Sequence, residues 1–329
     1  MDNIVDLLNN EVEVSEIINN ELQINPDDGI LTNDKQMNSG DDSIYHLPLG
    51  RALNINETYS ITAKESTKVI VLVGPSACGK TTIETMFYQM FHKGAIGDYY
   101  FAGSNTIQAY ENRSFYTRSR SRRTEAITPR TNRGTQEFLH LRTWNYIIDR
   151  FQNYLFADLS GEEIVGNIGN TQAILENYSY FSVADYIVAI LDGEIMIDKR
   201  KQKSAFEQIA QLLQTIYDSG VITNRTKLQL VISKYDIVDE KIEEFTPYIN
   251  RRVFELENRL KKYIEKVDFY YVAAMPTTKE KFSMGYGLEK LMLSWCTQVY
   301  TPNIITDKKI TVSSEFDKLQ EKLLGDGEI

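Results

Sequence analysis

One stretch of eight residues constrains the fold of this chain more than any other feature. It reads GPSACGKT, from Gly74 to Thr81, and it matches the phosphate-binding pattern G-x-x-x-x-G-K-[ST] at every fixed position. An apolar run, 68–73, precedes it, and the stretch 80–92 that follows has apolar residues spaced for one face of a helix. The pattern binds phosphate when it lies between a strand and a helix. The sequence therefore predicts a P-loop.

The residue types in this loop are suited to holding a chain of phosphates. Glycines let the backbone curl so that its N–H groups point inward, and the following helix adds positive potential at its N-terminus. We expect Lys80 to reach the outer phosphates and the Thr81 hydroxyl to bind Mg²⁺. Cys78 is interpreted as a small filler, with redox sensing as the alternative. The predicted nucleotide-contacting residues of the loop are Gly74, Ser76, Ala77, Cys78, Gly79, Lys80, Thr81 and Thr82.

From residue 68 onward, short apolar runs alternate with stretches of helical periodicity. This alternation is typical of an α/β fold in which a mostly parallel sheet carries helices on both faces. The runs 138–141 and 154–157 are expected to be a pair of strands that flank a turn near Asp149. Further strands are predicted at 68–73, 186–191, 228–232 and 269–273, and helices at 80–92, 201–217, 253–264 and 288–295.

The segment 94–134 interrupts this alternation because it is long, polar and basic. Connections of this length inside a domain are more often functional than inert. The segment contains no known nucleic-acid-binding module, so nucleic acid is not the expected partner. Its arginines are Arg113, Arg118, Arg120, Arg122, Arg123, Arg130 and Arg133.

Acidic residues concentrate at the N-terminal end of the chain. Residues 1–45 contain eleven Asp and Glu against one Lys, and this charge of −10 equals the formal charge of the whole chain. Many Asn, Asp and Glu residues, few aromatic residues and turn-forming sequences such as NPDDG predict a mostly disordered tail that repels nucleic acid. We therefore expect an acidic tail (1–45), a P-loop domain (46–300, with 94–134 as a basic insertion) and a C-terminal extension (301–329).

No membrane or secretory signal is visible in the sequence. No window approaches the about 18 consecutive apolar residues that a membrane helix needs, and the N-terminus lacks the basic-then-apolar pattern of a signal peptide. The two cysteines, Cys78 and Cys296, give no disulfide framework. A cytoplasmic protein is the expectation.

The run 228–238, LQLVISKYDIV, bears on which nucleotide the loop holds. An apolar strand ends there in SKYD, which resembles the [NT]KxD guanine-recognition motif of GTPases, with Ser233 in the first position. The carboxylate of Asp236 is suited to accept two hydrogen bonds from the guanine edge, whereas adenine would leave it unpaired. The aliphatic stem of Lys234 is expected to lie over the base plane. The pattern therefore favours guanine over adenine.

A second loop, ADLSGEE (157–163), follows another apolar strand. Its D-x-x-G pattern is suited to hold the Mg²⁺ shell with Asp158 and to contact the γ-phosphate with the Gly161 N–H, a contact that hydrolysis removes. Ras-like enzymes orient the attacking water with Gln at the next position, where this chain has Glu162. A carboxylate sits less easily beside a γ-phosphate, so we predict slow unassisted hydrolysis and a partner that completes the site.

The strand end YVAA (271–274) resembles the short SA-type motif whose backbone N–H meets guanine O6. Spacing does not choose between Ala273 and Ala274.

A threonine that senses Mg²⁺ and the γ-phosphate is expected shortly before the strand 138–141. Thr128, Thr131 and Thr135 are the candidates, and we prefer Thr131 because it lies in a constrained TPRT turn. Arg130 or another arginine of this segment is a candidate to neutralise transition-state charge, although most of them are expected to be solvated.

Taken together, these motifs resemble the translation-factor-like (TRAFAC) class of GTPases, and more narrowly the bacterial double-GTPase family associated with conflict and defence gene clusters. The resemblance spans about 67–298 and is carried by GPSACGKTT, YFAGSNTIQAYENR, TPRT, LHLRTW, ADLSGEE, ADYIVAILDGE and LVISKYDIV. It implies a Ras-like domain that works as a nucleotide switch in a multi-protein system, often with a dedicated activating component. The chain departs from a double architecture in having one P-loop.

The sequence thus predicts a P-loop GTPase with GTP or GDP and Mg²⁺ as cofactors. Lys80, Glu162 and Thr131 are the predicted catalytic residues, and Thr81, Asp158 and Thr131 the predicted metal ligands. A protein activator or effector is the expected partner. Two alternatives stay open: a pseudo-GTPase scaffold that holds nucleotide without turnover, and a P-loop ATPase or kinase in which SKYD is coincidental.

Overall fold

The computed structural model describes residues 50–115, 136–277 and 280–296. The chain divides into two units between Leu47 and Pro48, and the described residues all belong to the second. The predictions for the acidic tail, for most arginines of the insertion and for residues 301–329 lie outside the described residues. No helix in the described ranges is long and apolar enough to cross a membrane.

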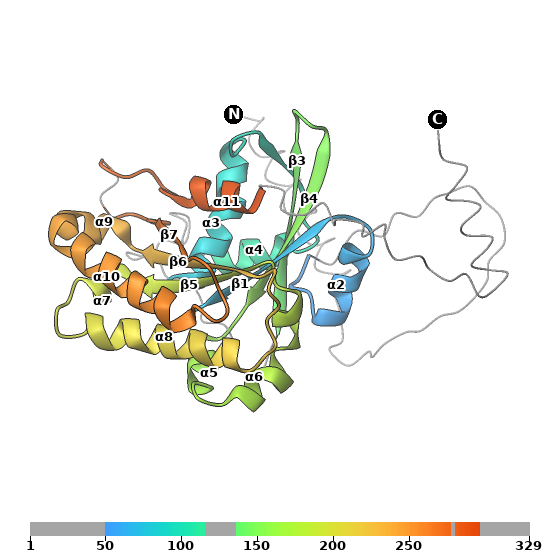
Figure 1. Cartoon of the computed structure of the whole chain (residues 1–329). Helices are drawn as coiled ribbons and strands as arrows, with labels where there is room; N and C mark the ends of the chain where they lie inside the picture. The colour runs from blue at the N-terminus through green and yellow to red at the C-terminus, as the bar shows by residue number, and fades with distance from the viewer. Residues whose placement is uncertain (1–49, 116–135, 278–279, 297–329) are drawn as a thin grey trace, which may run out of the picture. The chain divides into compact units, whose positions relative to one another are not determined.

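A seven-stranded sheet forms the centre of the described unit (Figure 1), in the order β2-β3-β4-β1-β5-β6-β7. Strands β4, β1, β5, β6 and β7 run parallel, and β3 is antiparallel to both β2 and β4. The predicted α/β fold with a mostly parallel sheet is therefore confirmed. The strands are β1 Thr67–Val73, β2 Tyr99–Gly103, β3 Glu137–Asn145, β4 Arg150–Asp158, β5 Tyr186–Asp192, β6 Lys227–Ser233 and β7 Asp268–Tyr271.

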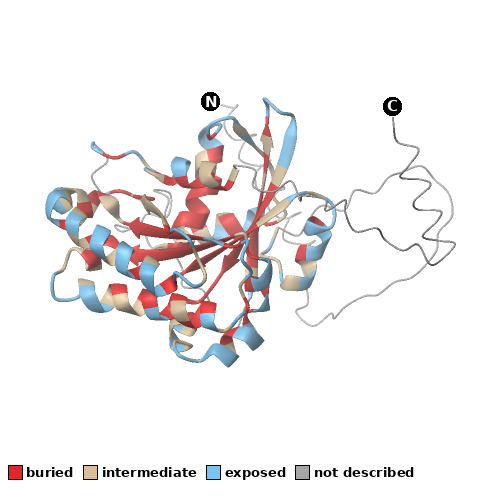
Figure 2. Ribbon diagram, viewed as in Figure 1, coloured by how far each residue is buried: buried red, intermediate tan, exposed pale blue. Residues whose placement is uncertain are grey.

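Strand β1 is apolar on both sides because helices cover both faces of the sheet. Val69, Val71 and Val73 belong to one core cluster, and Ile70 and Leu72 to the other. The buried residues shown in Figure 2 accordingly follow the central strands and the inner faces of the helices. The helices, including the 3₁₀ segments η3 and η4, are α2 Ile55–Thr62, α3 Lys80–Lys93, α4 Ile107–Ser114, α5 Gly161–Gly166, α6 Thr171–Asn177, η3 Ser179–Val183, α7 Gly193–Met196, α8 Gln202–Asp218, α9 Tyr235–Val238, η4 Asp239–Lys241, α10 Ile242–Leu260 and α11 Leu288–Cys296.

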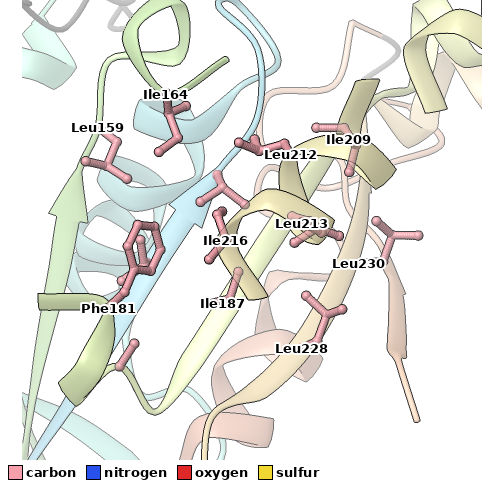
Figure 3. Close-up of a cluster of buried hydrophobic side chains, with 14 of the residues drawn as sticks. Leu159, Ile164, Phe181, Ile187, Ile209, Leu212, Leu213, Ile216, Leu228 and Leu230 are labelled. Carbon is pink, nitrogen blue, oxygen red and sulfur yellow. The ribbon is translucent and has the colours of Figure 1, made fainter. Parts of the chain in front are cut away.

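Helix α8 packs its apolar face against β5 and β6 through the first cluster. Figure 3 shows Leu212, Leu213 and Ile216 of α8 beside Ile187 of β5 and Leu228 of β6. Each such fully buried side chain stabilises the fold by about 1.5–3 kcal/mol relative to leaving it exposed. The second cluster lies on the opposite face and joins α3, α4 and α11 to the sheet. The two clusters fix the ends of β1, β4 and β6 relative to one another.

Two expectations about local structure need correction. The segment 94–134 was expected to be one long connection that interrupts the alternation of strands and helices, but its described part contains β2 and α4. Strand β2 is only five residues long and is not fully buried, and it is held as a strand by antiparallel pairing with β3. Helix α10 begins at Ile242, well before the predicted residue 253, and continues past Pro247. Its buried positions Phe245 and Ile249 show that packing against the first cluster outweighs the loss of one backbone donor.

Candidate functional site

The loop GPSACGKT connects the carboxyl end of β1 to α3 and has a backbone that depends on glycine. Gly79 lies at φ +99°, in the left-handed region that glycine adopts without strain. A Cβ at Gly74 would lie 2.7 Å from the carbonyl oxygen of Ile190 and 2.9 Å from Cys78 Sγ. The buried Cys78 thiol therefore packs under the turn, and burial raises its pKa. This agrees with the interpretation of Cys78 as a filler.

Lys80 begins α3 and is buried inside the loop. Its ammonium donates to the carbonyl oxygens of Gly74 and Pro75, at 2.9 Å each. A cation is thus held at the centre of a curled backbone, which is the arrangement that a phosphate chain requires.

The loop 157–163 packs directly on this cation. A Cβ at Gly161 would lie 2.6 Å from Lys80 Nζ and 2.6 Å from the backbone nitrogen of Ser76. Only glycine lets the two loops approach this closely. Gly161 begins α5, whose first turn carries Glu162 and Glu163, so negative charge lies where a helix dipole favours it.

Asp158, the last residue of β4, is buried beside the same loop, with a side chain that is 1% exposed. Arg113 Nε donates to Asp158 Oδ2 at 2.9 Å, and Arg113 Nη2 donates to Glu137 Oε2 at 2.6 Å. Burial acts to lower the pKa of Arg113, but the charges of Asp158 and Glu137 raise it. Residue composition alone did not distinguish Arg113 from the other arginines of its segment. The signal that could have found it is its place on the short helix α4.

A second buried carboxyl group lies one turn beyond Lys80 on α3. Glu84 is fully buried, and neither of its carboxyl oxygens has a hydrogen-bond partner among the described residues. Burial raises the pKa of Glu84 well above its usual range, and the negative charge of Asp158 raises it further. The buried Glu84 carboxyl therefore favours its neutral form beside Asp158.

The SKYD segment lies close to the other side of the P-loop. A Cβ at Gly79 would lie 3.8 Å from the Ser233 Cβ, and Ser233 Oγ donates to the carbonyl oxygen of Leu191. Lys234 adopts a left-handed backbone conformation, and its ammonium contacts the carboxylates of Asp192 at 2.8 Å and Glu194 at 2.9 Å. These two partners come from the sequence LDGE, where β5 ends and α7 begins.

Asp236 is buried and is fixed from one side by a residue that the sequence analysis did not single out. Its Oδ2 accepts hydrogen bonds from the backbone N–H of Thr277 at 2.8 Å and from its hydroxyl at 2.9 Å. Thr277 follows the YVAA strand end by three residues. Within that strand end, the N–H of Ala273 donates to the carbonyl oxygen of Tyr286 and is therefore engaged within the fold.

The preferred sensing threonine, Thr131, lies outside the described residues, as do Thr128, Thr135 and Arg130. The remaining predicted residues lie at or just after the carboxyl ends of β1, β4, β6 and β7. These four strands are parallel, so their carboxyl ends lie on the same side of the sheet. In open α/β sheets ligands bind outside the carboxyl ends of the strands.

The donor set fits Mg²⁺. The Thr81 hydroxyl and the Asp158 carboxylate are hard oxygen ligands, and the described ranges contain no cluster of three or more His, Cys, Asp or Glu that could hold a metal. Mg²⁺ in nucleotide sites takes one or two protein oxygens, together with phosphate oxygens and water.

Comparisons with known proteins were made for sequence and for structure. The sequence model of the family described as Double-GTPase 2 matches residues 68–296. A comparison with curated proteins finds no match. Similar solved structures include the elongation factor SelB from Methanococcus maripaludis with the GTP analogue GppNHp (12% identity, TM-score 0.34, covering 72% of this chain and 35% of that one). They also include the signal recognition particle receptor SRb-GTP/SRX complex from Chaetomium thermophilum (15%, 0.34, 69% and 95%) and a bacterial selenocysteine-specific elongation factor, EF-Sec (15%, 0.35, 70% and 28%). The chain spans about a third of the length of the two elongation factors.

Proposed function

The chain belongs to the Double-GTPase 2 family, and from this premise we propose that it is a regulatory switch that binds GTP or GDP with Mg²⁺ and hydrolyses GTP slowly. The observation that carries the proposal is the meeting of three loops at one edge of the sheet. A Cβ at Gly161 would touch Lys80, and a Cβ at Gly79 would touch Ser233. The segments proposed to bind phosphate, to sense the nucleotide state and to read the base therefore lie next to one another.

Each residue of the phosphate end has a role that its position supports. Lys80 neutralises the outer phosphates from inside the loop, and Gly161 offers its N–H next to that ammonium. Thr81 and Asp158 are proposed to hold Mg²⁺, which when bound neutralises phosphate charge. Thr131 is proposed to complete the metal shell.

At the base end, Asp236 reads the guanine edge while Thr277 holds its carboxylate. Lys234 is kept in place by Asp192 and Glu194 and offers its stem to the base. Ser233 braces the loop through its contact with Leu191.

Glu162 supports slow turnover, because a second negative charge near the γ-phosphate neither orients water as glutamine does nor relieves repulsion. A protein partner that supplies the missing group is therefore part of the proposal, as are a cytoplasmic location and a place in a bacterial multi-protein system of antiphage defence. The same residue favours a second candidate function, a scaffold that holds GTP without hydrolysing it.

Equilibrium binding of a fluorescent GTP analogue with Mg²⁺, followed by single-turnover hydrolysis, tests the proposal. Lys80→Ala should weaken binding by at least about 100-fold, since charge-assisted hydrogen bonds to a buried phosphate are worth about 1.5–3 kcal/mol each. Lys93→Ala, at the exposed far end of the same helix, is the control and should bind like the wild type. Equal affinity for Lys80→Ala and wild type would remove the site assignment. Tight binding without turnover would favour the scaffold.

A further inference from the structure

The buried ion pair between α4 and the end of β4 is the feature that the proposed function leaves unexplained. Arg113 lies on α4, within the insertion, yet its guanidinium reaches the carboxylate proposed for Mg²⁺. Its side chain is 17% exposed, and that of Asp158 is 1% exposed. Screening by solvent is therefore weak at this contact.

The strand register explains why a cation is needed there. Glu137 and Asp158 are directly opposite one another in the antiparallel β3–β4 pair. Like charges in this position repel each other. Arg113 bridges the two, through Nε to Asp158 and Nη2 to Glu137. The guanidinium thus supplies the positive charge that Asp158 would otherwise obtain from a metal ion.

We propose that Arg113 competes with Mg²⁺ for the Asp158 carboxylate, so that α4 sets the Mg²⁺ concentration at which the protein takes up nucleotide. This inference rests on the proposed function, because it assigns Asp158 to the metal. Glu137 allows Arg113 to release Asp158 without losing every partner. Its side chain is 40% exposed and keeps one arm of the guanidinium when the contact to Asp158 is loosened. Arg113 therefore exchanges partners without becoming a buried unpaired charge, which would be costly.

A purely structural ion pair predicts a different pattern from a competing one. If Arg113 only stabilises the fold, its loss lowers stability and weakens Mg²⁺ binding or leaves it unchanged. If it competes, its loss lowers stability but strengthens the response to Mg²⁺. Loss of stability together with a stronger response to Mg²⁺ therefore indicates competition and not a purely structural role.

The experiment measures two quantities on the full chain: the melting temperature without nucleotide or metal, and the Mg²⁺ concentration that gives half-maximal binding of a fluorescent GTP analogue. Arg113→Gln should lower the melting temperature and lower the half-maximal Mg²⁺ concentration by about tenfold, the scale of one charge-assisted hydrogen bond. Glu137→Gln removes the charge that shares Arg113 with Asp158. It should therefore strengthen the Arg113–Asp158 contact and raise the half-maximal Mg²⁺ concentration several-fold. The Glu137 variant keeps the test open if Arg113→Gln does not fold.

Arg142→Gln is the control, because Arg142, on the same strand as Glu137, forms an ion pair with Glu65 at 2.5 Å. It should lower the melting temperature without moving the Mg²⁺ response. Arg113→Lys keeps the charge but not the forked donors, and its Mg²⁺ response should lie between those of the wild type and Arg113→Gln.

An unchanged or raised Mg²⁺ requirement in Arg113→Gln would overturn the inference. Failure of the wild type to bind the analogue at any Mg²⁺ concentration would instead overturn the proposed function.

Discussion

The phosphate end and the base end of the site are built differently. At the base end, the charged side chains have fixed partners: Lys234 contacts two carboxylates, and Asp236 accepts two hydrogen bonds from Thr277. At the phosphate end, Arg113 is shared between two carboxylates and Glu84 is buried without a hydrogen-bond partner among the described residues. Side chains with exchangeable partners suit the phosphate end, which must respond to the state of the nucleotide. Side chains with fixed partners suit the base end, which must recognise the nucleotide.

The largest effect is expected where the two loops of the phosphate end meet. Gly161→Ala forces a Cβ to within 2.6 Å of backbone atoms of the P-loop. We expect the free energy of unfolding to fall by about 2–3 kcal/mol, as for other overpacked sites, and nucleotide binding to be lost. Gly166→Ala is the control, since a Cβ at Gly166, in the same helix α5, meets nothing within 4 Å. Chemical denaturation would measure the free energy of unfolding of both variants, and titration with a fluorescent GTP analogue would measure their nucleotide binding. A wild-type stability for Gly161→Ala would mean that the loops are farther apart than described.

A smaller effect is expected at the base end. Thr277→Val removes the hydroxyl that donates to Asp236 but keeps the side-chain shape and the backbone N–H. GTP affinity should fall by about tenfold, because one hydrogen bond to a carboxylate is lost. Thr246→Val removes a hydroxyl that bonds within α10 and serves as the control. If GTP affinity is unchanged in Thr277→Val, the base end is held by backbone contacts alone.

The smallest effect concerns Glu84 and has the opposite sign. Its raised pKa means that the folded protein binds this proton more tightly than the unfolded chain does, so its contribution to stability is lost as pH rises above the ordinary glutamate value. Glu84→Gln should therefore increase stability by about 1 kcal/mol at pH 8, and the gain should shrink towards pH 5. Thermal melts at the two pH values, without nucleotide, check this. A loss of stability at pH 8 would show that the Glu84 charge is balanced in a way that the contacts do not reveal.

Much of the fold could be predicted from patterns within short stretches of the sequence. Buried parallel strands such as β1 and β5 are continuous apolar runs, and α8 repeats its apolar residues with helical spacing. The P-loop could be identified because the backbone conformation of the loop requires its glycines at positions only a few residues apart. Strand β2 was not, because it exists through pairing with β3, some forty residues later.

The partners within the site were the harder part to predict. Thr277 lies 41 residues from Asp236, and Arg113 lies 45 residues from Asp158. No spacing rule connects such pairs, because the sheet order and not the chain order brings them together. The motif residues themselves carry local signatures, whereas the side chains that position them do not.

The most direct test of the account is a change of base preference at Asp236. Displacement of a fluorescent GTP analogue by GTP, ATP and xanthosine triphosphate would be measured on the wild type, on Asp236→Asn and on Asp239→Asn, a nearby acid paired with Lys281. The account predicts that GTP but not ATP competes on the wild type and on Asp239→Asn, and that Asp236→Asn turns towards xanthosine triphosphate. Equal competition by ATP, with no change in Asp236→Asn, would contradict it and place the chain among P-loop ATPases or kinases.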